Sequence, residues 1–285
     1  MRRSVLTAAL LVLLVQVVGA LTLTRIPDGP DSLPPGGRVP TASAPLRVLV
    51  VGDSVMFDTE PALRAALAAA GPSRVESRSV FGFGLSRPEY YDWRAKWPRF
   101  VSEARPDAVV VMVGPFDTGP QRVRGRTLVP GTAAFAAWYG GLVEEAHSIL
   151  TASGARVFWV GTPWQRASGT RERVAAVNDV FRTVASRAGS VYIDSARRLA
   201  GRDGDYREFA AGPGGRVVRW RKTDGVHLCP DGAARVASAV VSALAPVWGM
   251  RTRTAWTAGD WRDDPRYRPT IYGGGCPPPP EGAAA

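Results

Sequence analysis

Apolar runs rich in β-branched residues alternate with helical stretches along most of this chain, and this alternation limits the folds that it can adopt. The clearest run covers residues 107–113, Asp-Ala-Val-Val-Val-Met-Val, which is the pattern of a strand buried on both faces. Strands that alternate with helices predict a parallel sheet covered on both sides and joined by right-handed crossovers. We expect strands at 47–51, 75–80, 107–113, 156–161 and 190–194, and helices at 60–70, 132–153, 170–188 and 231–245.

The N-terminal segment is typical of an export signal. Met1-Arg2-Arg3 precedes an apolar stretch that reaches Leu23, and small residues would allow cleavage after Ala20. The stretch is also close to the ~20 residues that cross a bilayer, so residues 1–24 are expected to be a signal peptide or a membrane anchor. In either case the rest of the chain is exported, to the cell surface or the extracellular space, and this segment provides the only membrane contact.

The remaining chain divides by composition into three parts. Residues 25–45 hold six prolines and three glycines, which is typical of an extended linker. Residues 46–246 carry the alternating pattern and are expected to form one domain. Residues 247–285 form a C-terminal tail that contains Trp248, Trp256 and Trp261. Such tryptophans can stack on sugar rings, but more often they pin a tail onto its domain.

The charge balance indicates which partners to expect. The net charge is +11 at pH 7, and nearly all the positive residues are arginines, because Lys96 and Lys222 are the only lysines. A basic surface attracts anionic partners in general. No basic run is interleaved with aromatic residues as in nucleic-acid modules, so we expect no nucleic-acid binding. We expect a monomer.

Three residues far apart in the chain have the chemistry of a nucleophilic site. Ser54 follows the first apolar run within Gly52-Asp53-Ser54, and a serine on the turn after a strand is presented at the carboxyl edge of a parallel sheet. A serine hydroxyl becomes nucleophilic when a histidine takes its proton and a carboxylate orients the imidazole. Asp224 and His227, three residues apart, supply both groups, and His227 is one of only two histidines. The order Ser54, Asp224, His227 therefore predicts a serine hydrolase.

These motifs resemble the SGNH hydrolases, also called GDSL esterases or lipases, over residues 46–245. The resemblance implies an α/β fold, a three-layer α/β/α sandwich with a parallel, flavodoxin-like sheet of about five strands. It also implies Ser54 as the nucleophile, with Asp224 and His227 on one loop as acid and base. The stretch Tyr90-Tyr91-Asp92-Trp93 and the cysteine-bearing tail are similar to exported, actinobacterial-type members associated with cell-surface polysaccharides.

The resemblance also implies an oxyanion hole, and here the chain departs from the family. A glycine after the second strand would donate its N–H together with that of Ser54; we expect Gly84, with Gly82 as the alternative. The family's third block is Gly-x-Asn-Asp, but this chain has Phe116 in place of the asparagine, and phenylalanine donates no hydrogen bond. Loss of one such donor lowers turnover ~10²–10³-fold in other enzymes. The sequence does not rank the candidate replacements, which are Gln165, Asn178 and Arg87.

The cysteines and glycines bear on disulfides, metals and cofactors. Cys229 lies two residues after His227, and Cys276 lies in the tail. In an exported protein an even cysteine count favours a disulfide, which would pin the tail beside the active site; two unpaired thiols are the alternative. Two histidines and two separated cysteines do not make a typical zinc site, and the Gly82/Gly84 pair lacks the third glycine of a dinucleotide loop. We expect neither a metal nor a cofactor.

Together these features predict an exported serine esterase. It would be a carboxylic ester hydrolase that removes O-acyl groups, above all O-acetyl groups, from an acylated glycan or another small ester. An acyltransferase shares the same acyl-enzyme, so the sequence does not separate the two. The alternative is a non-catalytic glycan-binding module that keeps the fold. Phe116 favours that alternative, whereas the complete set of Ser54, Asp224 and His227 favours the enzyme.

Overall fold

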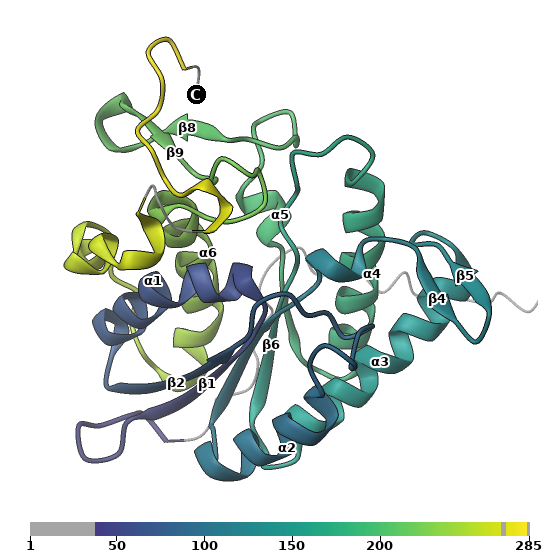
Figure 1. Ribbon diagram of the computed structural model, residues 1–285. Coiled ribbons are helices and arrows are strands. Elements are labelled where there is room, and N and C mark those ends of the chain that lie inside the picture. Colours follow the sequence, from purple (N-terminus) through teal and green to yellow (C-terminus); the bar gives the residue numbers. More distant parts are fainter. Residues whose placement is uncertain (1–37, 269–271, 284–285) are drawn as a thin grey trace, which may run out of the picture. The chain divides into compact units, whose positions relative to one another are not determined.

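The computed structural model describes residues 38–268 and 272–283 (Figure 1). The predicted export segment 1–24 and residues 25–37 of the predicted linker lie outside the described residues. Over the described ranges, none of the helices is long and apolar enough to cross a membrane.

A five-stranded sheet forms the centre of the fold, and each neighbouring pair of its strands is parallel. Its strands are β1 (Leu46–Gly52), β2 (Ser73–Ser79), β3 (Ala108–Met112), β6 (Arg156–Val160) and β7 (Val191–Ile193). Their order across the sheet, β2-β1-β3-β6-β7, is flavodoxin-like and confirms the predicted parallel sheet. Because β2 and β3 lie on opposite sides of β1, a ligand site is expected beyond the carboxyl ends of β1 and β3.

Helices cover both faces of this sheet, which confirms the predicted α/β/α sandwich (Figure 1). The first face is covered by α1 (Ser54–Ala70) and α6 (Pro230–Leu244), and the second by α2 (Trp93–Ala104), α3 (Ala133–Thr151) and α4 (Arg171–Arg187). In β1, Val48 and Val50 join the core under α1 and α6, whereas Leu49 and Val51 join the other core. Successive side chains of a strand alternate between faces, so a continuous apolar run is needed to bind both helical layers.

The helices α1 and α2 differ most from the sequence-based expectation. The sequence predicts a helix from residue 60, but α1 begins at Ser54, because the Asp53 carboxylate accepts a hydrogen bond from the N–H of Val55 at 2.9 Å and caps the helix. Pro61 therefore lies inside α1 and leaves the Phe57 carbonyl without its intrahelical donor. The sequence pattern predicts no helix at α2. In the structure Asp92 caps α2, and its buried residues recur at helical spacing: Trp93, Trp97 and Val101.

Short elements surround the sheet. The antiparallel pairs are β4 (Gln121–Val123) with β5 (Arg126–Leu128), and β8 (Phe209–Ala211) with β9 (Val217–Arg219); α5 (Ser195–Arg198) follows β7. The described part of the tail forms 3₁₀ helices at Ala245–Trp248, Ala255–Ala258, Asp260–Asp263, Pro265–Tyr267 and Tyr272–Gly274. Trp248 and Trp256 are buried in the core that contains α1 and α6, so these two tryptophans pack the tail onto the domain.

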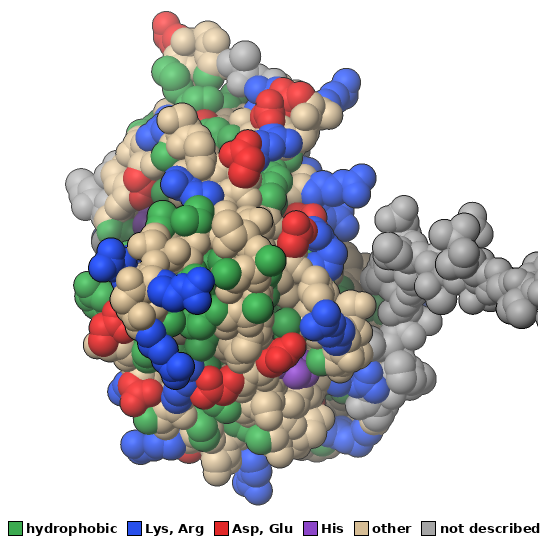
Figure 2. All heavy atoms as spheres, turned by 90° about the vertical axis from the view of Figure 1, so that its right-hand side faces the viewer, with side chains coloured by type: hydrophobic (Ala, Val, Ile, Leu, Met, Phe, Trp, Pro, Cys, Tyr) green, Lys and Arg blue, Asp and Glu red, His purple; other side chains and the backbone are tan. Residues whose placement is uncertain are grey.

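Charged side chains of both signs share the surface. On the face turned to the viewer in Figure 2, lysine and arginine side chains are interspersed with aspartate and glutamate. Ion pairs also link neighbouring helices, for example Arg94 of α2 with Glu145 of α3 at 2.6 Å. On this face the net positive charge is therefore not gathered into one basic patch.

Candidate active site

The turn from β1 into α1 is held by two residues that precede Ser54. Gly52 has no room for a side chain, because a Cβ there would lie 2.2 Å from the carbonyl oxygen of Met112 on β3. Asp53 is completely buried, and its Oδ2 accepts a hydrogen bond from the N–H of Gly114 at 3.0 Å. Burial raises the pKa of Asp53 to about 7, against the opposing effect of the hydrogen bonds that the carboxylate accepts. These contacts join the turns after β1 and β3 and place Ser54 at the carboxyl edge of the sheet.

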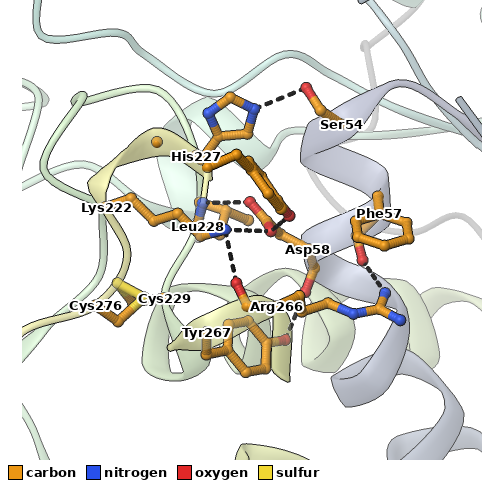
Figure 3. Close-up of polar contacts among 12 residues, drawn as sticks. Ser54, Phe57, Asp58, Lys222, His227, Leu228, Cys229, Arg266, Tyr267 and Cys276 are labelled. Atoms are coloured by element: carbon orange, nitrogen blue, oxygen red, sulfur yellow. Dashed lines mark hydrogen bonds and ion pairs between the residues drawn. A yellow bond between two sulfur atoms is a disulfide. The ribbon is translucent and has the colours of Figure 1, made fainter. Parts of the chain in front are cut away.

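Ser54, His227 and Asp224 form one hydrogen-bonded chain, part of which is drawn in Figure 3. Oγ of Ser54 lies 2.8 Å from Nε2 of His227, and Nδ1 of His227 lies 2.5 Å from Oδ2 of Asp224. Oδ1 of Asp224 accepts hydrogen bonds from the backbone N–H groups of Val226 and His227 at 2.9 and 3.1 Å. Burial disfavours the carboxylate, but these hydrogen bonds outweigh it and lower the pKa of Asp224. An ionised Asp224 favours a proton on Nδ1, which leaves Nε2 to accept the proton of Ser54.

One carboxylate on α1 holds both ends of the loop 222–228, which we call the His227 loop. Oδ1 of Asp58 accepts a hydrogen bond from Nζ of Lys222 at 2.9 Å, and Oδ2 accepts one from the N–H of Leu228 at 2.9 Å (Figure 3). Both side chains of the Asp58–Lys222 pair are fully buried. Asp58 lies one helical turn after Ser54, so the first turns of α1 carry the nucleophile and also position the loop of its base.

Neither Asp58 nor Lys222 is predicted as a site residue from the sequence, although local signals for both exist. Lys222 is one of only two lysines and lies two residues before Asp224. Asp58 follows Ser54 at helical spacing, but this signal is lost when the helix is expected to begin at residue 60. Burial raises the pKa of Asp58 and lowers that of Lys222, each against the attraction of its partner.

The glycine expected in the oxyanion hole, Gly84, lies against a carboxylate of the third block. A Cβ at Gly84 would lie 2.2 Å from Oδ1 of Asp117, so a larger residue would displace that side chain. Asp117 is buried and accepts hydrogen bonds from the N–H groups of Leu85 and Ser86 at 3.0 and 3.1 Å, and from the hydroxyl of Tyr139 at 2.6 Å. Asp117 thereby fixes the peptide groups that follow Gly84. This contact gives Asp117, which is not selected from the sequence, a supporting role beside Gly84, and the choice of Gly84 over Gly82 stays a prediction.

Unpaired backbone donors, among them the two predicted for the oxyanion hole, lie at this edge of the sheet. Among the described residues, the N–H groups of Ser54 and Gly84 have no hydrogen-bond acceptor. Ser54 is the first residue of α1, where N–H groups lack intrahelical partners and the helix end carries partial positive charge. Both N–H groups are therefore available to an anionic oxygen.

Phe116 stands where the resemblance implies an asparagine, and one candidate replacement is excluded. The Asn178 amide is used elsewhere, because its Oδ1 accepts from the N–H of Thr162 at 2.7 Å and its Nδ2 donates to the Thr162 carbonyl at 2.9 Å. The guanidinium of Arg87 lies over the Phe116 ring, 6.0 Å from its centre. Arg87 and Gln165 stay predictions for the third donor.

A disulfide joins the tail to the end of the His227 loop. Cys229 immediately follows this loop and precedes α6, and its sulfur is bonded to that of Cys276 in the tail (Figure 3). The two Cα atoms are 5.6 Å apart. The predicted partners thus lie together beside His227.

Comparison with known proteins places the chain in a family. Residues 47–243 match a family described as "Protein of unknown function (DUF459)". The chain belongs to this family. The matched residues contain Ser54, Asp224, His227, Asp58 and Lys222, and they end before the tail. None of the curated proteins matches this chain.

Solved structures share its fold at low sequence identity. A GDSL-like lipase from Bacteroides thetaiotaomicron is 12% identical with a TM-score of 0.50, over 70% of this chain and 87% of that chain. A mutant of an acetyl-xylooligosaccharide esterase from Geobacillus stearothermophilus is 15% identical with a TM-score of 0.51, over 76% and 100%. An alpha/beta hydrolase enzyme from the metagenome of Lake Arreo, Spain, is 20% identical with a TM-score of 0.51, over 70% and 95%. These likenesses confirm the expected resemblance at the level of the fold.

Proposed function

We propose that this protein is an exported serine esterase that removes, or transfers, O-acyl groups on cell-surface carbohydrate, with O-acetyl groups as the first class to test. The observation that carries the proposal is the hydrogen-bonded chain from Asp224 through His227 to Ser54. A serine, an imidazole and an ionised carboxylate in this order are the parts that activate a hydroxyl for attack on an ester.

The reaction follows from these positions. His227 Nε2 removes the hydroxyl proton as Ser54 Oγ attacks the ester carbonyl, and Asp224 stabilises the imidazolium that forms. The N–H groups of Ser54 and Gly84 receive the oxyanion of the tetrahedral intermediate. Collapse of the intermediate breaks the bond to the sugar oxygen, which takes the proton from Nε2, and leaves the acyl group on Ser54. Water, or a second sugar hydroxyl in a transferase, then attacks this acyl-enzyme with His227 again as the base.

Exposed aromatic rings support a carbohydrate substrate. Phe81, Tyr90 and Phe116 belong to the loops after β2 and β3 and expose 45%, 68% and 39% of their surface. The Arg87 guanidinium lies between two of them, 5.7 Å from the ring centre of Tyr90 and 6.0 Å from that of Phe116. Flat aromatic faces with a neighbouring cation suit sugar rings and their polar substituents. The predicted N-terminal export segment and the fold shared with an acetyl-xylooligosaccharide esterase favour the same substrate class.

Labelling with a fluorophosphonate tests the nucleophile directly. We expect the purified protein to be modified at Ser54, identified by mass spectrometry of the digested protein, and His227→Ala to abolish the modification. Ser153→Ala is the matched control, because Ser153 is an exposed serine just after α3 and is no part of the hydrogen-bonded chain. No modification of folded wild-type protein would refute an activated serine.

Phe116 supports a second candidate, a glycan-binding module without turnover, because the position that would donate the third hydrogen bond holds a phenyl ring. The two functions separate in one experiment with acetylated xylan. In an esterase, Ser54→Ala releases no acetate but binds the glycan as the wild type does. In a binding module, the wild type also releases none.

A further inference from the structure

Two tail residues lie against the Asp224–His227 pair. The Tyr272 ring is edge-on to the His227 imidazole, with the ring centres 5.1 Å apart and the planes at 80°. The Gly273 carbonyl accepts a hydrogen bond from the N–H of Asp224 at 3.1 Å. The tail therefore contacts both residues that activate Ser54.

The approach of the tail backbone to this pair is close. Gly273 has a φ of 70°, which favours glycine, and a Cβ there would lie 2.6 Å from Oδ2 of Asp224 and 3.2 Å from Nδ1 of His227. These are the two atoms that share the hydrogen bond of the pair. The tail thus covers one side of that bond and leaves no room there for a methyl group.

Tyr272 contacts α1, the His227 loop and the loop after β2. Its hydroxyl donates a hydrogen bond to Asp58, and Nζ of Lys222 lies 3.5 Å from its ring centre. Its ring also meets Phe81, in the loop between β2 and α2 that carries Gly84, edge-on at 4.5 Å between centres. Burial and the nearby Asp58 carboxylate raise the pKa of Tyr272, so the phenol stays protonated as a donor.

The tail is held on both sides of this contact. On the N-terminal side, the Arg266 guanidinium donates a hydrogen bond to the Phe57 carbonyl, which Pro61 leaves free inside α1 (Figure 3). On the C-terminal side, Cys276 is bonded to Cys229 (Figure 3). These two attachments help to hold Tyr272 and Gly273 against the His227 loop.

We propose that Tyr272 is a positioning residue for His227 and that the Cys229–Cys276 bond is the latch that keeps it in place. The proposal rests on the proposed function of Ser54 and His227. Proton transfer from Ser54 requires a fixed imidazole, and a displacement of about 1 Å in such a site lowers rates by about 10²-fold. Loss of the Tyr272 ring removes the aromatic neighbour of the imidazole and one donor from Asp58. The effect should therefore appear in kcat.

The role of the Cys229–Cys276 disulfide can be tested by chemical reduction. Both cysteines line a surface cavity of about 640 Å³, and Cys276 is only partly buried. Dithiothreitol would transfer two electrons and two protons to the bond, giving two cysteine thiols and the cyclic disulfide of the reagent. Reduction should free the C-terminal side of the tail.

The experiment compares Tyr272→Ala, Tyr272→Phe and Cys276→Ser with Trp261→Phe in the full-length protein. Trp261 also packs the tail, through its indole N–H on the Trp256 carbonyl at 2.6 Å, but among the described residues it makes no hydrogen bond or ring contact with the His227 loop. We expect Tyr272→Ala to lower kcat on p-nitrophenyl acetate about 10- to 100-fold with KM within about threefold. Tyr272→Phe should recover most of this loss. The kcat values of Cys276→Ser and of the reduced wild type should lie between those of Tyr272→Ala and Tyr272→Phe. Trp261→Phe should lower Tm and leave kcat unchanged.

A second readout does not depend on turnover. The chain has two histidines, so the ring signals of His227 can be assigned by NMR with a His147 variant. We expect a slowly exchanging Nδ1 proton of His227 in the wild type, and its loss in Tyr272→Ala and after reduction.

These outcomes separate the two proposals. A wild type without activity, whose Nδ1 proton is lost in Tyr272→Ala, would overturn the proposed function and keep the positioning role. Unchanged kcat and unchanged Nδ1 exchange in folded Tyr272→Ala would overturn the positioning role. Equal losses of kcat in Tyr272→Ala and Trp261→Phe at an equal folded fraction would also overturn it, because they would show a general effect of the tail on stability.

Discussion

Removing one charge of the Asp58–Lys222 pair should destabilise this protein far more than removing both. The two side chains are completely buried, and their charged atoms are 2.9 Å apart. Loss of one partner leaves an uncompensated charge in the core, which lowers the free energy of unfolding by about 3–5 kcal/mol. For a domain of this size, such a loss lowers Tm by roughly 10 °C.

The partners that the remaining charge keeps decide which single variant loses more free energy of unfolding. In Lys222→Met, the Asp58 carboxylate keeps the N–H of Leu228 and the hydroxyl of Tyr272 as donors, so we expect a loss near about 3 kcal/mol. In Asp58→Asn, the ammonium of Lys222 keeps the Arg266 carbonyl at 2.8 Å and the Tyr272 ring but no opposite charge. One amide oxygen also cannot replace both carboxylate oxygens that accept from Lys222, Leu228 and Tyr272, so the loss should approach about 5 kcal/mol. The double variant holds no charge, so its loss should be smaller than that of either single variant and far below the sum of the two.

The assay is urea unfolding followed by circular dichroism at pH 7 and 25 °C, with linear extrapolation of the free energy to water. Additive losses, or single losses below about 1 kcal/mol, would refute a buried and coupled ion pair. The fluorophosphonate reaction separates stability from positioning. In the double variant, labelling at Ser54 should stay slower than in the wild type even where stability recovers, because the Lys222 end of the His227 loop is no longer held.

Three further changes test other parts of the site. Phe116→Asn should raise esterase turnover by about tenfold or more by adding an oxyanion donor, whereas Phe116→Ala should not; equal rates of the two variants would contradict this. Asp224→Asn should slow labelling of Ser54 by about 10⁴-fold, because the amide favours the wrong imidazole tautomer, and a small decrease would place the orienting group elsewhere. Burial raises the pKa of Asp53 from 3.8 to about 7, so its contribution to stability is complete below pH 4 and is lost as the pH rises to 7. Urea unfolding should therefore show Asp53→Asn gaining stability relative to the wild type between pH 5 and pH 8, and a constant difference would refute the raised pKa.

Much of the fold could be predicted because its signals are local. Apolar residues from Val48 to Val51 in β1 and throughout β3 are what a strand between two helical layers requires, and these runs are visible without any partner. Helix boundaries were harder. α1 begins at Ser54 because Asp53 caps it, and the sequence prediction instead places Pro61 at a helix start, where proline is common.

The catalytic candidates were predictable for a related reason. Ser54 directly follows a strand, and Asp224 and His227 share one loop, so each motif is compact in the sequence. In a parallel α/β sheet, ligand sites lie beyond the carboxyl ends of the strands, so both motifs are expected at that edge. The pairing of Cys229 with Cys276 rested on an even cysteine count and an oxidising compartment.

The sequence by itself therefore determined the layered α/β architecture and the identity of Ser54, Asp224 and His227 as candidates, because periodicity and short motifs are properties of neighbouring residues. Only the tertiary structure decided what supports them. Asp58 meets Lys222 across 164 residues, Asp117 lies against Gly84 of another loop, and the tail returns from Tyr272 to the His227 loop. Such contacts depend on how buried polar groups find partners in the packed molecule, and a buried carboxylate looks like a surface carboxylate in the sequence.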